Sequence, residues 1–142
     1  MVVRLQALEE RCRQRGVPVT VQRRAILEAV LRRKDHPSAD DIFEAVHARL
    51  PQVSRTTIYR VLDTFVDMGL IRRLRQTGAA RFDRNIDRHH HLICTRCGKV
   101  MDLEDPALDQ LPMPKHKLHG FEIDDYSVQF SGTCPDCQRH KE

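Results

Sequence analysis

Hydrophobic residues recur at helical spacing through the first half of the chain. Residues 3–15 are predicted to form a helix that ends before Gly16. A second helix is predicted over residues 21–33, with Thr20 as its N-cap. The apolar stripe that this helix would bury is formed by Val21, Ile26, Val30 and Leu31.

Two further helices and a hairpin follow. Ser38 and Asp41 have the spacing of a capping box, before an apolar stripe that continues to Leu50. Ser54 is predicted to cap a helix that ends at Gly69. The next residues predict two short strands around a turn at Gly78, with basic side chains at Arg72, Arg73, Arg75 and Arg81. This order of elements predicts a winged helix.

The fourth predicted helix has a polar face at its start. Its members are basic, hydroxyl or aromatic residues: Arg55, Thr56, Tyr59 and Arg60. Such side chains suit a helix in the major groove of DNA. Residues 1–82 carry 16 Lys and Arg against 9 Asp and Glu, whereas residues 83–142 carry 8 against 11. The pattern favours DNA binding by the first half, although a protein-binding module with a half-buried Tyr59 is the alternative.

The composition is that of a soluble globular protein, with 40% hydrophobic and 31% charged residues among 142. No run of eighteen apolar residues exists, and the first twelve residues are too charged for a secretory signal. We therefore expect a cytoplasmic protein that does not contact membranes. In such a chain the five cysteines indicate metal ligands rather than disulfides.

Four of the cysteines form two CxxC pairs, Cys94 with Cys97 and Cys134 with Cys137. A two-residue gap lets both thiolates reach one tetrahedral ion, so the pairs predict a structural Zn²⁺ site. A redox CxxC is the alternative. Residues 121–134 alternate in polarity and predict the strand that brings the second pair to the first. Cys12 is expected to be only a small buried residue.

Three consecutive histidines precede the first CxxC pair. On a strand, His89 and His91 point to one side and His90 to the other. A hairpin closing at the first CxxC pair would place Asp102 roughly opposite His89. Two imidazoles and a carboxylate on one face predict a second, exchangeable metal site, which Asp83 and His36 could complete.

The chain resembles the ferric uptake regulator (Fur) superfamily from end to end. The pieces that carry the resemblance are "VTVQRRAILEAV", "HPSADDIF", "SRTTIYRVLDTFVDMGLI", "RFD", "HHHLICTRCGKVMDLE" and "CPDC". The resemblance implies an α+β protein, with a winged-helix DNA-binding domain at 1–82 and a small α/β dimerisation domain at 83–142 that holds a four-cysteine zinc site. It also implies a homodimeric, metal-dependent repressor that binds a palindromic operator.

By position, the resemblance assigns structural zinc to the four paired cysteines, and regulatory Fe²⁺ or Mn²⁺ to His36, Asp83, His89, His91 and Asp102. At positions 83 and 102 this chain has Asp, as in the peroxide-sensing PerR branch that it resembles. The iron-sensing branch has Glu at both positions. In proteins of the PerR branch, peroxide oxidises histidines that bind the metal, and the corresponding residues here would be His36 and His89. An iron- or manganese-uptake regulator is the alternative, and a zinc-uptake regulator is a weaker one because no cysteine but Cys12 is free.

The chain departs from the family in one region of its second half. At the family's additional metal site, Arg88 and Tyr126 replace histidines, His90 replaces an Asp and Asp109 a Glu. We therefore assign no metal there, although His90, His116 and His119 remain candidate ligands. Where the family has a helix, Pro112 and Pro114 would interrupt one.

An enzyme is the rival from another class. A zinc hydrolase needs an open metal position and a general base in a pocket, and no HExxH or comparable motif is present. We expect no enzymatic activity, and no small-molecule ligand other than metal and H₂O₂.

Overall fold

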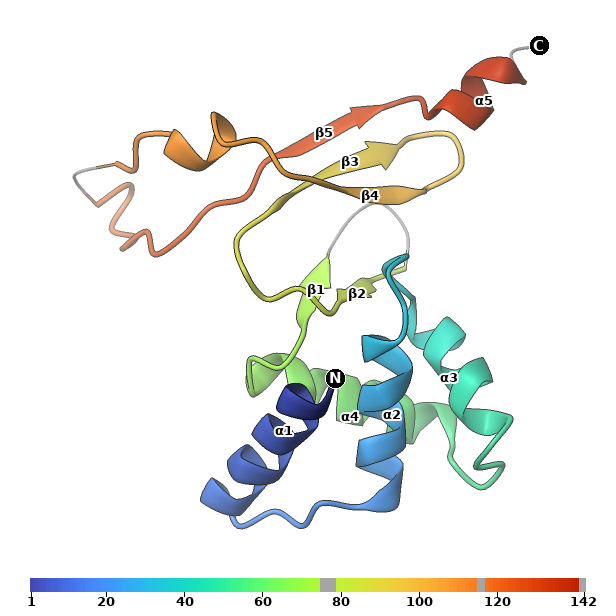
Figure 1. Ribbon diagram of the computed structural model, residues 1–142. Coiled ribbons are helices and arrows are strands. Elements are labelled where there is room, and N and C mark those ends of the chain that lie inside the picture. Colours follow the sequence, from blue (N-terminus) through green and yellow to red (C-terminus); the bar gives the residue numbers. More distant parts are fainter. Residues whose placement is uncertain (75–78, 115–116, 141–142) are drawn as a thin grey trace. The chain divides into compact units, whose positions relative to one another are not determined.

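The structure is a computed structural model that describes residues 1–74, 79–114 and 117–140 (Figure 1). It divides into two compact units, Met1–Ile86 and Asp87–Glu142, each of which is described by itself. The predicted turn at Gly78, together with Arg75 and His116, lies outside the described residues. Among the described residues, no helix combines the length and apolar character that a bilayer crossing requires.

Four helices make up most of the first unit. They are α1 (Val2–Gln14), α2 (Val21–Leu31), α3 (Ala39–His47) and α4 (Arg55–Asp67). The predicted caps are confirmed. The Thr20 hydroxyl accepts from the Arg23 amide at 3.1 Å, and the Ser54 hydroxyl accepts from the Thr57 amide at 3.2 Å. Ser38 and Asp41 form a capping box with bonds of 3.1 and 2.9 Å.

The apolar stripes of these helices meet in one core. The prediction for Val21 was wrong, because this first residue of α2 is 74% exposed. The fully buried members of the core include Leu8, Ile26, Ile42, Leu62 and Phe65. Cys12 belongs to the same core, as expected, with no exposed surface. The helix α3 stops at His47, earlier than its apolar stripe, although Leu50 still packs against the core as that stripe predicted. Pro51 explains the early stop, since the residue before a proline avoids helical geometry.

The hairpin after α4 consists of β1 (Arg72–Leu74) and β2 (Arg81–Asp83), which pair antiparallel. The loop before α3 joins it, because the Phe82 amide donates to the Pro37 carbonyl at 2.8 Å. Four helices followed by a two-stranded hairpin are a winged helix, as predicted.

The second unit is built on a three-stranded sheet of order β4-β3-β5. Its strands are β3 (His90–Cys94), β4 (Val100–Leu103) and β5 (Gln129–Gly132), with β4 antiparallel and β5 parallel to β3. A 3₁₀ turn, Leu108–Gln110, ends before Pro112, which confirms that the prolines stop a helix here. A short helix α5, Pro135–Arg139, completes the unit.

The predicted strand over residues 121–134 was too long, because only Gln129–Gly132 pairs with a neighbour. The amide of Val128, just before β5, donates to the His90 side chain instead of to a backbone carbonyl. A side-chain acceptor thus takes the place of the ladder bond that would have extended the strand.

Candidate metal centres and nucleic-acid interface

The four paired cysteines converge in the second unit. Cys94 ends β3 and Cys97 lies in the turn after it, while Cys134 caps α5 and Cys137 lies within that helix. The parallel register of β3 with β5 pairs Cys94 with Gly132, which brings the second CxxC beside the first. All four sulfurs lie within 4.8 Å of one another.

The cysteine cluster fits one tetrahedral ion. Two thiolates bound to one Zn²⁺ at about 2.3 Å lie about 3.8 Å apart in a tetrahedron, and the Cys97 and Cys134 sulfurs are separated by 3.7 Å. All the cysteines lie in the described part of the chain, and none of them is in a disulfide. Four thiol donors at this spacing form a closed four-sulfur centre of the kind that holds structural zinc.

Hydrogen bonds shift the pKa values of two thiols of the cluster in opposite directions. Backbone N–H groups, first that of Cys134 and then that of Cys97, lower the pKa of Cys94 to about 6. The side chain of Cys134 is the largest cause that raises the pKa of Cys137 to about 12. Cys94 is therefore a thiolate at neutral pH, whereas Cys137 keeps its proton until an ion displaces it.

His36 and Asp83 meet within the first unit. The bond from the Phe82 amide to Pro37 aligns the loop before α3 with β2, and Arg81 donates to the His36 carbonyl at 3.1 Å. His36 Nε2 then lies 3.3 Å from the Asp83 carboxylate, with both side chains buried. His36 also has a φ of 56°, a conformation that a non-glycine residue adopts only where its surroundings impose it.

His89, His91 and Asp102 meet within the second unit. Asp102 is directly opposite His91, not opposite His89 as predicted, so the expected register was wrong by two residues. A two-residue shift keeps the same face of the sheet, because side chains alternate with period two. Asp102 Oδ1 therefore reaches both rings, at 3.4 Å from His89 Nε2 and 3.5 Å from His91 Nε2.

Within each of these two groups, the donors have the spacing of ligands to a divalent ion. Two ligand atoms about 2.1 Å from one ion lie roughly 3.0–3.4 Å apart, depending on whether the angle between them is right or tetrahedral. His89 Nδ1 donates to the Asp87 carbonyl at 2.7 Å, which leaves Nε2, the nitrogen that faces Asp102, to bind an ion. Imidazole and carboxylate donors without sulfur are typical of Fe²⁺ and Mn²⁺ sites.

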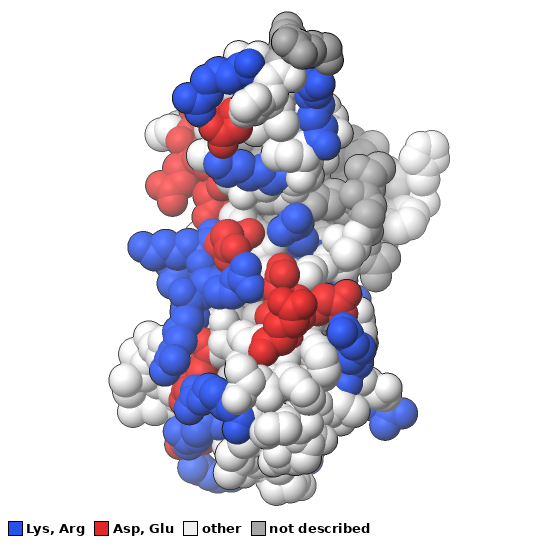
Figure 2. Space-filling model, turned by 90° about the vertical axis from the view of Figure 1, so that its right-hand side faces the viewer, with Lys and Arg blue, Asp and Glu red and all other residues white. Residues whose placement is uncertain are grey.

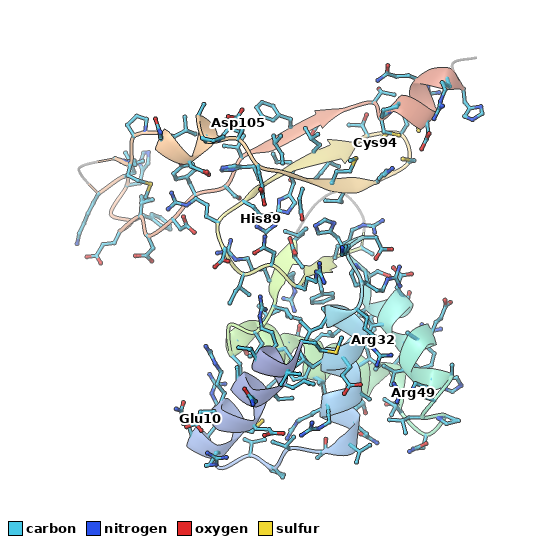
Figure 3. The ribbon with its side chains drawn as sticks, in the orientation of Figure 1. Glu10, Arg32, Arg49, His89, Cys94 and Asp105 are labelled. Atoms are coloured by element: carbon cyan, nitrogen blue, oxygen red, sulfur yellow. The ribbon has the colours of Figure 1, made fainter. Side chains whose placement is uncertain are left out.

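Figure 3 labels His89, which immediately precedes β3, and Cys94, which ends it. At about 3.3 Å per residue, the five steps from His89 to Cys94 span roughly 16 Å. The sulfur cluster and the histidine–carboxylate group are therefore separate centres on one strand.

The predicted DNA-contacting residues all lie on the first two turns of α4. Each of the four, Arg55, Thr56, Tyr59 and Arg60, is exposed. The Arg55 guanidinium, however, lies over the Phe43 ring and bonds to the Asp40 carboxylate. Sequence reasoning missed these partners, because nothing in the pattern indicates that the start of α3 lies beside the start of α4.

The basic charge of the first unit is interleaved with acidic charge, as the blue and red side chains of Figure 2 show. Arg24 pairs with Glu9, and Arg33 with Asp35. In the wing, Arg73 pairs with Asp63 and lies near the Phe82 ring. Several arginines of this unit are thus paired with carboxylates of the same unit.

The ferric uptake regulator family model matches residues 14–131, which is most of the chain. The chain belongs to this family. Its members are metal-dependent transcriptional regulators. Both halves of the predicted α+β fold, including the four-cysteine cluster, are confirmed.

Relatives from this family cover nearly the whole chain. The peroxide-responsive repressor PerR of Staphylococcus aureus is 35% identical over 127 residues, which are 89% of this chain and 86% of that protein. The ferric uptake regulator of Francisella tularensis, solved with iron, has a TM-score of 0.73 at 28% identity, covering 87% of this chain and 96% of that one. The Helicobacter pylori Fur structure has a TM-score of 0.79, covering 96% and 92%, and at 20% identity it bears on the fold alone.

Proposed function

We propose that this Fur-family regulator is a homodimeric repressor that releases its operator when peroxide oxidises its regulatory metal site. The observation that carries the proposal is the sulfur-free donor set, with aspartate at both acidic positions, 83 and 102. The 35% identity to a peroxide-responsive repressor supports the same branch. We place it in the cytoplasm and assign it no enzymatic activity.

The four-cysteine centre is proposed to be structural. Four thiolates saturate a tetrahedral ion and leave no open position, so Zn²⁺ there would hold β3, β5 and α5 together rather than react. Because the metal-bound state exists only in the folded chain, zinc binding adds to the free energy of unfolding.

The regulatory ion is proposed to take ligands from both units. His36 and Asp83 would supply one part of the shell, and His89, His91 and Asp102 the other. Residues 84–88 connect the two groups in sequence. An ion bound by both would restrict the angle between the DNA-binding unit and the dimerisation unit, and its loss would release that restraint.

Peroxide sensitivity follows from which ion is bound. Fe²⁺ supplies an electron to H₂O₂ when bound, whereas Mn²⁺ at the same donors does not. In the net reaction, a ring C–H of His36 or His89 would be oxidised by two electrons to C=O. One oxygen of H₂O₂ enters the ring and the other leaves as water. An oxidised ring is a poorer ligand, so the restraint on the two units would be lost.

DNA recognition is proposed for the exposed start of α4. Arg55 and Arg60 would contact phosphate or guanine, Thr56 phosphate, and Tyr59 a thymine methyl. Two copies related by a two-fold axis would read the two halves of a palindromic operator.

The decisive experiment compares Fe²⁺-loaded and Mn²⁺-loaded protein bound to a palindromic operator duplex. After a small excess of H₂O₂, the iron form should release DNA and gain about 16 Da, one oxygen, on peptides that contain His36 or His89. The manganese form should keep its mass and its DNA. The peptide with His140, an exposed histidine on the C-terminal side of α5, is the internal control and should not change.

Each of the other outcomes would indicate a different function. If iron-loaded protein keeps both its mass and its DNA, the protein responds to iron or manganese supply rather than to peroxide. Oxidation found only on cysteines would indicate a thiol switch. Metal-independent DNA binding would contradict the regulatory site itself.

A further inference from the structure

The middle histidine of the three, His90, makes contacts that differ from those of its neighbours. Its side chain points to the opposite face of β3 from that of His91, and it has no exposed surface. The Val128 amide donates to His90 Nδ1 at 2.9 Å, and His90 Nε2 lies 2.8 Å from the Asp109 carboxylate. Both ring nitrogens are therefore engaged within the chain.

These two bonds fix the protonation of the His90 ring. A backbone N–H can only donate, so Nδ1 must present its lone pair to Val128. The ring proton then resides on Nε2, which donates it to Asp109. In this form the imidazole is neutral, and neither nitrogen is open to an ion unless one of these two bonds breaks.

Tyr126 holds the turn that carries Asp109. Its hydroxyl donates to the Leu108 carbonyl at 2.5 Å and accepts from the Leu111 amide at 3.1 Å, one bond on each side of Asp109. The Tyr126 ring also lies nearly parallel to that of His90, with centroids 6.2 Å apart.

Arg88 contacts both Tyr126 and Asp125. Its guanidinium lies 4.7 Å from the centre of the Tyr126 ring and donates to Asp125 at 2.7 Å. A cation over an aromatic ring is attracted by the ring's quadrupole. Contacts of these side chains thus tie together the segment before β3, the 3₁₀ turn and the segment before β5.

We propose that His90, Asp109, Tyr126 and Arg88 form a metal-free latch that fixes β3 and thereby positions His89 and His91 for the regulatory ion. Arg88 and His90 alternate along the chain with His89 and His91, so a shift of β3 that broke the His90 bonds would also move the two ligand rings. This inference rests on the proposed metal site at His89 and His91. It assigns the latch itself no ion.

The test titrates Mn²⁺ into the full-length zinc-loaded protein by calorimetry, with wild type expected to bind one exchangeable ion per chain. Asp109→Ala removes the bond to His90, and Tyr126→Phe removes the two bonds to Leu108 and Leu111. Each variant should weaken Mn²⁺ binding by about tenfold, as loss of a group that orients a ligand does. Asp109→Asn keeps an oxygen that accepts from His90 Nε2–H and should retain near wild-type affinity. Glu122→Gln, which alters only an exposed ion pair with Lys117, is the control.

A readout without the regulatory ion separates positioning from ligation. In the zinc-loaded protein, hydrogen exchange of the Val128 amide should become faster in Asp109→Ala and stay slow in Asp109→Asn, since that amide donates to His90.

Three results would overturn the latch. Unchanged Mn²⁺ affinity in Asp109→Ala, even with a lower melting temperature, would leave these residues only structural. Two exchangeable ions in wild type, reduced to one in Asp109→Asn, would make them ligands instead. Unchanged hydrogen exchange of the Val128 amide in Asp109→Ala would mean that the bond from His90 to Asp109 does not stabilise the bond from Val128 to His90. Failure of the proposed function is a distinct result, since wild type would then bind no exchangeable ion.

Discussion

The guanidinium of Arg55 lies 4.3 Å from the centre of the Phe43 ring, so the first residue of α4 is held against α3. The same guanidinium bonds to Asp40, in the first turn of α3. A residue proposed to contact DNA is thus oriented by an aromatic ring and partly neutralised by a carboxylate. Exposed pairs of this kind are weak, so DNA phosphate can compete with Asp40 for the arginine.

Removing the charge of Asp40 should strengthen DNA binding. Asp40→Asn takes a negative charge from beside the proposed interface, and we expect a few-fold gain in affinity that shrinks as salt is raised. Arg55→Ala should weaken binding and lower the salt slope by about 1. The control is Asp67→Asn, which makes the same charge change at the far end of α4. An equal gain in DNA affinity in Asp40→Asn and Asp67→Asn would mean that the change in net charge, and not the contact with Arg55, causes the effect.

Tyr59 should contribute to DNA affinity without contributing to folding. Its side chain is 49% exposed, whereas the neighbouring Ile58, Val61 and Leu62 are buried. Tyr59→Ala is therefore expected to weaken operator binding by about 1–3 kcal/mol and to leave metal content and melting temperature unchanged. Gel-shift titration and thermal denaturation measure the two effects. Full affinity in the variant would mean that another part of α4 reads the DNA.

Cys97→Ser should abolish zinc binding and destabilise the second unit, because the cluster would lose one of its four thiolates. Cys12→Ala is the matched control: it also removes a thiol, but from the core of the first unit, and should keep one zinc per chain. Metal analysis and thermal denaturation report the outcome. A folded Cys97→Ser protein that retained zinc would contradict the assignment of zinc to all four cysteines.

Zinc affinity should also rise with pH. Ligation displaces a proton from Cys137, whose pKa is about 12, whereas Cys94 is already a thiolate above pH of about 6. Acid restores protons to the thiolates, so zinc should bind more weakly at pH 6 than at pH 8. A competition titration with a chelator at the two pH values measures this, and pH-independent affinity would contradict it.

The dimer should involve the apolar face of the second unit's sheet. Leu92, Met101 and Phe130 are neighbours across the three strands, each between 41 and 49% exposed, and line a hollow of about 200 Å³. An exposed apolar group of this kind marks an interaction surface. Phe130→Ser should shift the protein toward monomer in light scattering, while Gln129→Ser, on the opposite face of β5, should not. Equal dimer content in both variants would place the interface elsewhere.

The sequence by itself determined the elements whose signals are local. The caps at Thr20, Ser38 and Ser54 and the stripes of α1–α4 follow from neighbours within a few residues, and the structure confirms them except at the exposed Val21. The two CxxC pairs likewise predicted a cluster, because a two-residue gap already limits where both sulfurs can point.

The tertiary structure decided what depends on register and on segments distant in the chain. Sequence spacing placed Asp102 opposite His89, and only the geometry of the turn that closes the hairpin put it opposite His91. The bond from Val128 to His90 crosses 38 residues and shortened the predicted strand. Arg55 meets Phe43 and Asp40 for the same reason: packing of the α3 and α4 stripes sets their distance, and no local pattern encodes it.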